Sequence, residues 1–302
     1  MPYIKKITSH IQGEEVVAQG NDLIRHARFQ LTSLEQNIIY FCISKIKPDD
    51  KDFMRQTFTI KEFCEACGIE AGGNEYRRIK AMVKSVSDKS TWVLYSNGVE
   101  SLVRWFDTYE IDHTNSTITA VLSQSIKPYL LGLIERARTG GEGYTQALLA
   151  TYLSIQSKYG KRLYEVLKSY LYDTGERMYK TQIVEYDLAE LKSLLNAEKY
   201  TRYQDLRRFV LETAVREINE VTDIGVSYHP IKKGRAIASV QFIYQYKETK
   251  ERMESFKTAV DRLKKRKKTT ETHQTKKLTP RKKDPHKVKN EKHTASDDCT
   301  SP

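Results

Sequence analysis

The stretch VEYDLAELKSLLNAEKYTRYQDLRRFVLETAVREINEV, residues 184–221, decides the fold. It opens with a short β-like run at 184–186 and continues into an amphipathic segment, 188–195, which we expect to form a short helix ending near Asn196. A longer helical pattern then fills residues 203–221. Two helices joined by a tight turn predict a helix-turn-helix.

A β-hairpin is predicted directly after these two helices. Residues 226–228 and 236–246 are β-like, and the segment between them contains Pro230 and Gly234, which favour a turn. A helix-turn-helix followed by such a hairpin is a winged helix.

The first half of the chain shows the same order of elements. We expect helices over 31–47, 61–67 and 74–89, a β-like run over 56–60 before the second helix, and β-like runs over 91–96, 101–111 and 117–122 after the third. Thr32 and Glu35 have the spacing of a capping box at the start of the first helix. Asn97-Gly98 is a hairpin signal between the first two late runs, and 113–116 is a turn between the last two.

The two halves also align at an offset of 128 residues. The aligned positions are Phe58, Ile60, Phe63 and Gly68 against Tyr186, Leu188, Leu191 and Asn196. A chance alignment of apolar residues is the alternative, and the shared order of elements favours the repeat. The predicted fold class is therefore α+β, with tandem winged-helix domains joined by helices over 126–137, 145–157 and 161–172.

The pattern divides the chain into five segments. These are an N-terminal extension at 1–19, a first winged helix at 20–138, a connecting loop and helix at 139–160, a second winged helix at 161–256 and a tail at 257–302. The tail holds 15 Lys and Arg against 6 Asp and Glu, so it carries +9 of the chain's net charge of +12. Because it is highly charged and contains no aromatic residue, we expect it to be disordered, either as a solvated tail or as a phosphate-binding arm.

Composition excludes several classes of protein. The chain has 302 residues, and no apolar run approaches the ~18 residues of a membrane span. The N-terminus lacks the apolar segment of a signal peptide. The four cysteines do not form a disulfide framework, so we expect a cytoplasmic protein with no membrane partner.

The helix at 203–221 has one apolar and one polar face. Steps of about 100° per residue place Leu206, Phe209, Val210, Ala214 and Val221 on the apolar face and Leu211 away from it. The polar candidates for DNA contact are Arg202, Gln204, Arg207 and Arg208, since Arg pairs with guanine and Gln with adenine. The hairpin tip adds Lys232, Lys233 and Arg235. A merely solvated charged face is the alternative for each group.

The helix at 74–89 repeats this arrangement in the first half. Tyr76, Ile79, Met82, Val83 and Val86 form its apolar side. Its basic residues, the candidates for a second DNA contact, are Arg77, Arg78, Lys80 and Lys84. Between Arg77 and Ser87 there is no acidic residue, which is unusual for a solvated helix face.

No catalytic or cofactor motif is present. A phosphate-binding Gly-x-x-x-x-Gly-Lys-Ser/Thr loop does not occur, and no His-x-His pair accompanies the tyrosines as in a nicking enzyme. Cys64 and Cys67 have CxxC spacing, but a zinc site needs about four ligands, so packing is favoured for this pair. We expect no metal, no cofactor and no catalytic residues, and an enzyme such as a nuclease is the least favoured class.

Three stretches resemble a known family. GNDLIRHAR at 20–28 followed by LTSLEQNII at 31–39, IKPYL at 126–130, and SKYGKRLYEVLK at 157–168 look like the theta-type plasmid replication initiators, the RepB/RepE/RepA-like family. Together they span most of residues 20–246, and the tail lies outside the resemblance.

The resemblance implies a function that the residue patterns alone do not. Such initiators bind directly repeated origin sequences, called iterons, in double-stranded plasmid DNA as monomers, and many dimerise and repress their own promoter. They open the origin and recruit host helicase and primase factors. The second winged helix gives the main major-groove contact, which points to Arg202, Gln204, Arg207 and Arg208 here. A winged-helix transcriptional regulator without a replication role remains the alternative.

Overall fold

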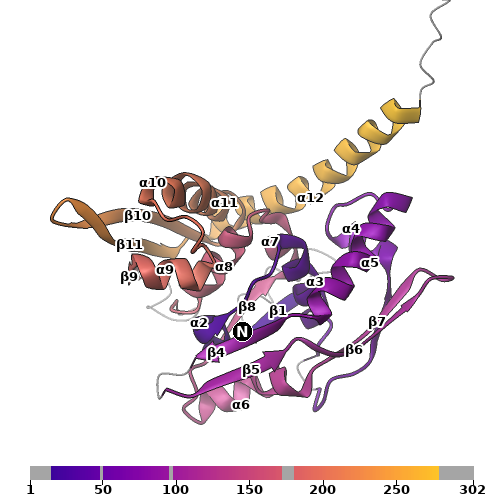
Figure 1. The fold of residues 1–302 in the computed structure, drawn as a ribbon, viewed down its shortest axis with the longest axis horizontal. Helices are drawn as coiled ribbons and strands as arrows, with labels where there is room; N and C mark the ends of the chain where they lie inside the picture. Colours follow the sequence, from indigo (N-terminus) through magenta and orange to yellow (C-terminus); the bar gives the residue numbers. More distant parts are fainter. Residues whose placement is uncertain (1–14, 48–49, 95–97, 172–179, 279–302) are drawn as a thin grey trace, which may run out of the picture.

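The computed structural model describes residues 15–47, 50–94, 98–171 and 180–278, with side chains as far as Arg266. Figure 1 shows two α+β lobes with a long C-terminal helix between them. The first lobe has the predicted helices and strands of a winged helix, with strand order β3-β7-β6. They are α3 Ser33–Ile43, β3 Gln56–Thr59, α4 Ile60–Ala66, α5 Gly73–Ser87, β6 Phe106–Asp112 and β7 Thr117–Leu122.

The second lobe is a winged helix with the same topology. Its sheet has the order β10-β11-β9, so in both lobes the strand before the short helix pairs with the second strand of the hairpin. Its elements are α8 Lys158–Lys168, β9 Gln182–Asp187, α9 Leu188–Leu195, α10 Tyr203–Leu206, η3 Arg207–Leu211, α11 Glu212–Val221, β10 Ile224–Lys233 and β11 Ala236–Tyr246.

The predicted internal repeat is confirmed by corresponding positions in the two lobes. Phe58 on β3 pairs with Ile118 on β7, as Tyr186 on β9 pairs with Val240 on β11. After the short helices, Gly68 and Asn196 both take left-handed backbone conformations, with φ of 66° and 51°. Gly and Asn are the residues that most readily end a helix in this way.

Local signals explain where two of the helices begin. Thr32 and Glu35 form the predicted capping box of α3, and Thr59 and Glu62 form another at α4. In each box the threonine hydroxyl accepts a hydrogen bond from the backbone N–H three residues later, and the glutamate accepts one from the threonine N–H. These bonds satisfy donors that the first turn of a helix leaves open.

The hairpin assigned to the first lobe needs correction. The β-like run 101–111 is two strands, β5 Glu100–Arg104 and β6, which belong to different sheets. β5 pairs with β4 Ser90–Leu94, which in turn pairs with β2 Ala27–Arg28. Trp105 lies between β5 and β6, where the chain passes from one sheet to the other, and its side chain is only 3% exposed. The wing is therefore β6–β7, and the hairpin with Gly98 is an insertion before it.

The connector also differs from the prediction. Residues 145–157, expected to be helical, contain β8 Tyr144–Leu148 followed by α7 Leu149–Ser154. β8 alternates buried and half-buried side chains and pairs with β1 Val16–Gly20, all but the last residue of which lies in the predicted N-terminal extension. Two period-2 strands so short are hard to separate from the adjoining helix by pattern alone. The helix expected over 126–137 is likewise divided, into η1 Gln124–Tyr129 and α6 Leu133–Arg138.

The prediction of disorder from residue 257 is wrong for its first part. Helix α12, Thr249–Leu278, runs through this region and packs on α7 and α11. Ala259 is fully buried and Leu263 packs on the core. Composition hid these few apolar positions among many lysines, although their i, i+4 spacing gives α12 an apolar stripe. Residues 279–302 lie outside the described part of the chain.

Candidate nucleic-acid interface

The second helix-turn-helix presents its basic residues to solvent as predicted. Arg202, Gln204, Arg207 and Arg208 are all exposed on the first turns of the helix formed by α10, η3 and α11. Arg202 Nε donates to Asp205 Oδ2 at 2.8 Å, and Arg207 Nε donates to Glu212 Oε1 at 2.9 Å. The guanidinium of Arg208 lies 5.3 Å from the ring centroid of Phe209.

A π turn changes which apolar side chains face the core. Leu211, predicted to point outward, is 0% exposed, whereas Phe209, predicted to be buried, is 50% exposed. The i→i+5 bonding of η3 accommodates one more residue in the turn and brings Leu211 onto the face of Leu206, five residues earlier. Phe209 instead stacks on Tyr200, with ring centroids 5.9 Å apart. The polar face therefore carries an aromatic pair beside its arginines.

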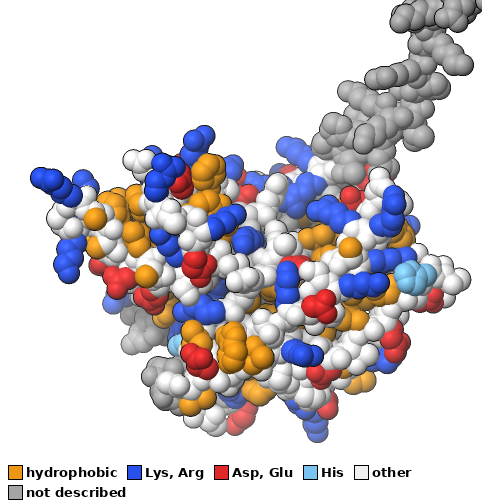
Figure 2. All heavy atoms as spheres, viewed as in Figure 1, with side chains coloured by type: hydrophobic (Ala, Val, Ile, Leu, Met, Phe, Trp, Pro, Cys, Tyr) orange, Lys and Arg blue, Asp and Glu red, His pale blue; other side chains and the backbone are white. Residues whose placement is uncertain are grey.

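The wing of the second lobe carries its charges at the tip. Lys232, Lys233 and Arg235 are exposed around Gly234, which has a φ of 66°. Figure 1 shows the β10–β11 hairpin projecting from the lobe, and Figure 2 shows Lys and Arg side chains around its end. Among the described residues, these three form no ion pair, so their charge is open to an anionic partner.

The long helix of the first lobe, α5, is amphipathic as predicted. Ile79, Met82, Val83 and Val86 are buried. On the other side Arg77, Arg78 and Lys84 are exposed and Lys80 is half-buried.

Short-range contacts hold the basic residues of α5. Arg77 Nη2 donates to Asn74 Oδ1 at 2.5 Å, and Arg78 Nη1 donates to Glu75 Oε2 at 3.1 Å. Lys80 Nζ lies 3.0 Å from Nδ1 of His113.

His113 connects α5 to the true wing of the first lobe. It lies in the turn between β6 and β7, which Asp112 braces by accepting from the backbone N–H groups of Thr114 and Asn115. The hairpin signal at Asn97-Gly98 lies instead between β4 and β5, away from this wing. The first wing tip therefore has one histidine and no Lys or Arg, whereas the second has three cations.

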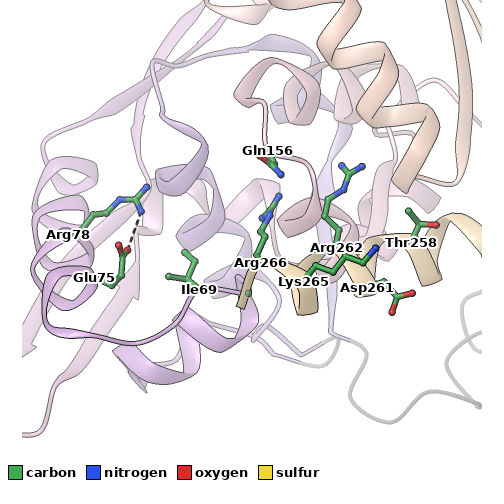
Figure 3. A pocket seen from close by; sticks show the side chains of 10 residues that line it. Ile69, Glu75, Arg78, Gln156, Thr258, Asp261, Arg262, Lys265 and Arg266 are labelled. Carbon is green, nitrogen blue, oxygen red and sulfur yellow. Dashed lines mark hydrogen bonds and ion pairs between the residues drawn. The ribbon is translucent and has the colours of Figure 1, made fainter. Parts of the chain in front are cut away.

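The basic residues near the middle of α12 were not singled out as a site, because their segment was expected to be disordered, as a solvated tail or a phosphate-binding arm. Arg262, Lys265 and Arg266 lie between the two lobes, facing Arg78 of α5 (Figure 3). The apolar stripe of Ala259 and Leu263 was the available signal, since it predicts a helix with a defined basic face.

The described residues offer no metal centre. No group of three or more His, Cys, Asp or Glu side chains in that part of the chain could hold a metal ion. Cys64 and Cys67 are fully buried, and burial raises the pKa of their thiols to about 11 and about 12. Both thiols therefore stay protonated and pack as small apolar groups, as predicted. No helix in the described ranges has the length and hydropathy of a membrane span.

Two family models match the chain. The model described as "Initiator Replication protein, WH1" matches residues 16–168, and "Initiator Rep protein, WH2" matches residues 187–244. The fold is similar to that of the Pi initiator protein, solved in complex with iteron DNA, with a TM-score of 0.62, 19% identity, and coverage of 79% of this chain and 100% of that one. Domains 2 and 3 of RctB are more distant, with a TM-score of 0.37, 12% identity, and coverage of 78% of this chain and 88% of that one.

Proposed function

The chain belongs to the family of initiator replication proteins, and from this premise we propose that it initiates plasmid replication by binding directly repeated origin sequences in double-stranded DNA. The observation that carries the proposal is the pair of family-matched winged helices, each with an exposed basic face on its long helix. A protein of the same fold, the Pi initiator, has been crystallised on iteron DNA, which supports this reading.

The second lobe is proposed to read the bases. An α-helix fits the major groove, where Arg bonds guanine and Gln bonds adenine through two atoms each. Arg202 is paired with Asp205, and Arg207 with Glu212, so each arginine has to break its ion pair before it can bind DNA. Arg208 has no carboxylate within ion-pair distance among the described residues, so base contact costs it no ion pair. We therefore assign it the main specific contact.

The other basic groups are proposed to bind phosphates. Lys232, Lys233 and Arg235 extend from the wing, where they reach the backbone or the minor groove beside the reading helix. On α5, Arg77 and Lys84 point outward and suit a second contact on the same duplex. Contacts to phosphate position the protein and supply salt-dependent affinity without sequence preference.

Further parts of the proposal rest on family membership. We propose that the chain acts in the bacterial cytoplasm by binding alone, without catalysis or cofactor. It would open the origin and recruit host helicase and primase factors. A homodimer in equilibrium with the monomer would repress the chain's own promoter.

Binding measurements with the Arg208→Ala variant test the base-reading assignment. Using a duplex selected from a random library, we expect the variant to lose about 1–3 kcal/mol of specific binding, with a much smaller loss on random duplex. Arg138→Ala is the control, because this exposed arginine lies on α6, away from both long helices (Figure 1). Equal losses on the two duplexes would make Arg208 a phosphate contact instead.

A replication assay separates initiation from regulation. A plasmid that carries the repeats selected by the protein should replicate only when the intact chain is supplied. Specific binding and promoter repression without any support of replication would establish the alternative, a winged-helix transcriptional regulator.

A further inference from the structure

Helix α12 is fixed against both lobes over its first five turns. Arg266 donates to the carbonyl oxygens of Leu153 and Ser154, at 3.0 Å and 2.8 Å, and Arg262 forms an ion pair with Glu220 of α11. The backbone of Leu263 lies directly against Gly68 at the end of α4. The side chains of α12 in this region therefore have defined positions between the lobes.

A pocket of 720 Å³ separates α12 from α5. Thr258, Asp261, Arg262 and Lys265 line one wall, and their spacing of three to four residues puts them on one face of α12. Glu75 and Arg78 of α5 line the other wall (Figure 3). The pocket thus lies between the long helix of the first winged helix and a helix that contacts the second.

The lining of this pocket is predominantly cationic. Arg78, Arg262, Lys265 and Arg266 outnumber Glu75 and Asp261 in the lining, although Arg78 is paired with Glu75 and Arg262 with Glu220 beside the pocket. Arg266 donates hydrogen bonds to two backbone carbonyl oxygens, which fixes its guanidinium beside the pocket. Figure 2 shows Lys and Arg side chains along the surface over α12 and α5. This charge favours an anionic occupant.

We propose that this pocket binds the sugar-phosphate backbone of the duplex that the two winged helices contact, which makes α12 a further DNA-contacting element. The inference rests on the proposed function. A helix about 10–12 Å across fills a major groove about 12 Å wide, so a strand of phosphates runs along each side of an inserted α5. The phosphates on the side of Arg78 would therefore lie next to the cationic wall that α12 forms.

The test uses the full chain with Lys265→Gln, Asp261→Asn and, as control, Arg138→Gln. Affinity is measured by titration at several salt concentrations on a library-selected duplex and on a random one. Lys265→Gln should weaken binding to both duplexes several-fold, with the slope of log affinity against log salt reduced by about 1. Asp261→Asn removes an opposing charge and should strengthen binding to both. Arg138→Gln should change neither.

The melting temperature of Lys265→Gln is measured to separate a loss of DNA contact from a loss of stability, and Lys265→Arg, which keeps the positive charge on this exposed position, should restore affinity. If Lys265→Gln and Asp261→Asn both bind like the control, the pocket does not contact DNA. A change in self-association by sedimentation, without a change in DNA binding, would instead assign the pocket to an acidic segment of a second copy and overturn the inference.

The proposed function fails separately from this inference. Selective duplex binding that depends on Arg208 but not on Lys265 would retain the reading helix and reject the α12 contact. If the library yields no selected duplex, the proposed function itself fails, and the α12 contact fails with it.

Discussion

Gly68 tests whether α12 is docked on the first lobe. Its φ of 66° costs an L residue about 1–2 kcal/mol. A Cβ on Gly68 would also lie 2.2 Å from the carbonyl oxygen of Leu263 and 2.9 Å from its Cα. These are backbone atoms, so no side-chain rotation relieves the clash and α12 has to move. Partial exposure of Leu263 and Ala259 adds about 1–3 kcal/mol. We therefore expect Gly68→Ala to lower the free energy of unfolding by about 2–5 kcal/mol.

Asn196→Ala is the matched control for this substitution. Asn196 ends α9 with a φ of 51°, as Gly68 ends α4, but it lies in the second lobe, whereas the backbone of Leu263 lies against Gly68. Its replacement should cost only about 1 kcal/mol, the backbone part. Urea unfolding gives both values, and limited trypsin digestion after Lys264 and Lys265 reports release of α12. The reasoning is refuted if the two variants unfold alike and digest at the same rate.

Three further predictions concern the packing and the tail. Thermal unfolding should show that Leu211→Ala destabilises the fold by about 2–5 kcal/mol, and Phe209→Ala by about 1 kcal/mol or less. A larger loss of stability for Phe209→Ala than for Leu211→Ala would contradict the π turn. Burial lowers the pKa of Lys161 to about 7. Between that value and the unfolded pKa near 10.5, only the unfolded chain holds the proton. Stability should therefore rise with pH by at most about 1.4 kcal/mol per unit, and Lys161→Met should flatten this rise in urea titrations at pH 7 and pH 9. Removing residues 267–302, which hold 10 Lys and Arg, should flatten the salt dependence of DNA binding but leave site preference intact; an unchanged slope would exclude a DNA-contacting tail.

The repeated winged helix could be predicted because its signals are local. Capping boxes, apolar periodicity and a Gly or Asn after each short helix act within a few residues of one another. The positions of Gly68 and Asn196 show this most clearly, since both residues end their helix in the left-handed conformation. The exposed arginines that flank α10, and those on α5, followed from the same periodicity.

The remaining features depend on contacts that no short window contains. The exposure of Phe209 follows from a π turn, in which bonding shifts by one residue without any Pro or Gly to mark it. β8 is a strand because β1, more than 120 residues earlier, pairs with it. The part of α12 from residue 257 onward resembled a solvated tail in composition, because the surfaces that dock it come from both lobes and lie far away in the sequence.

Buried polar bonds give the two lobes one relative placement. Lys161 Nζ of α8 donates to the carbonyl oxygen of Ser33 at 2.9 Å, and Arg162 Nη2 donates to that of Ala27 at 2.8 Å. Glu165 accepts a bond of 2.8 Å from Gln19. Because a buried polar group is costly when unpaired, these directional bonds disfavour sliding between the lobes. Arg266 of α12 adds bonds of the same kind to α7.

A fixed placement of the lobes predicts a fixed spacing on DNA. One base pair inserted at the centre of the selected duplex moves one half by about 3.4 Å and rotates it by about 35°. If both long helices enter the major groove of one site, a rigid protein cannot follow this change and loses the contacts of one lobe. We expect affinity to fall at least about tenfold, or about 1.4 kcal/mol, towards that for random duplex. The Arg208→Ala loss should persist on the altered site, because the second lobe still reads its half. Undiminished affinity would show that the lobes move independently, or that only one of them enters the groove.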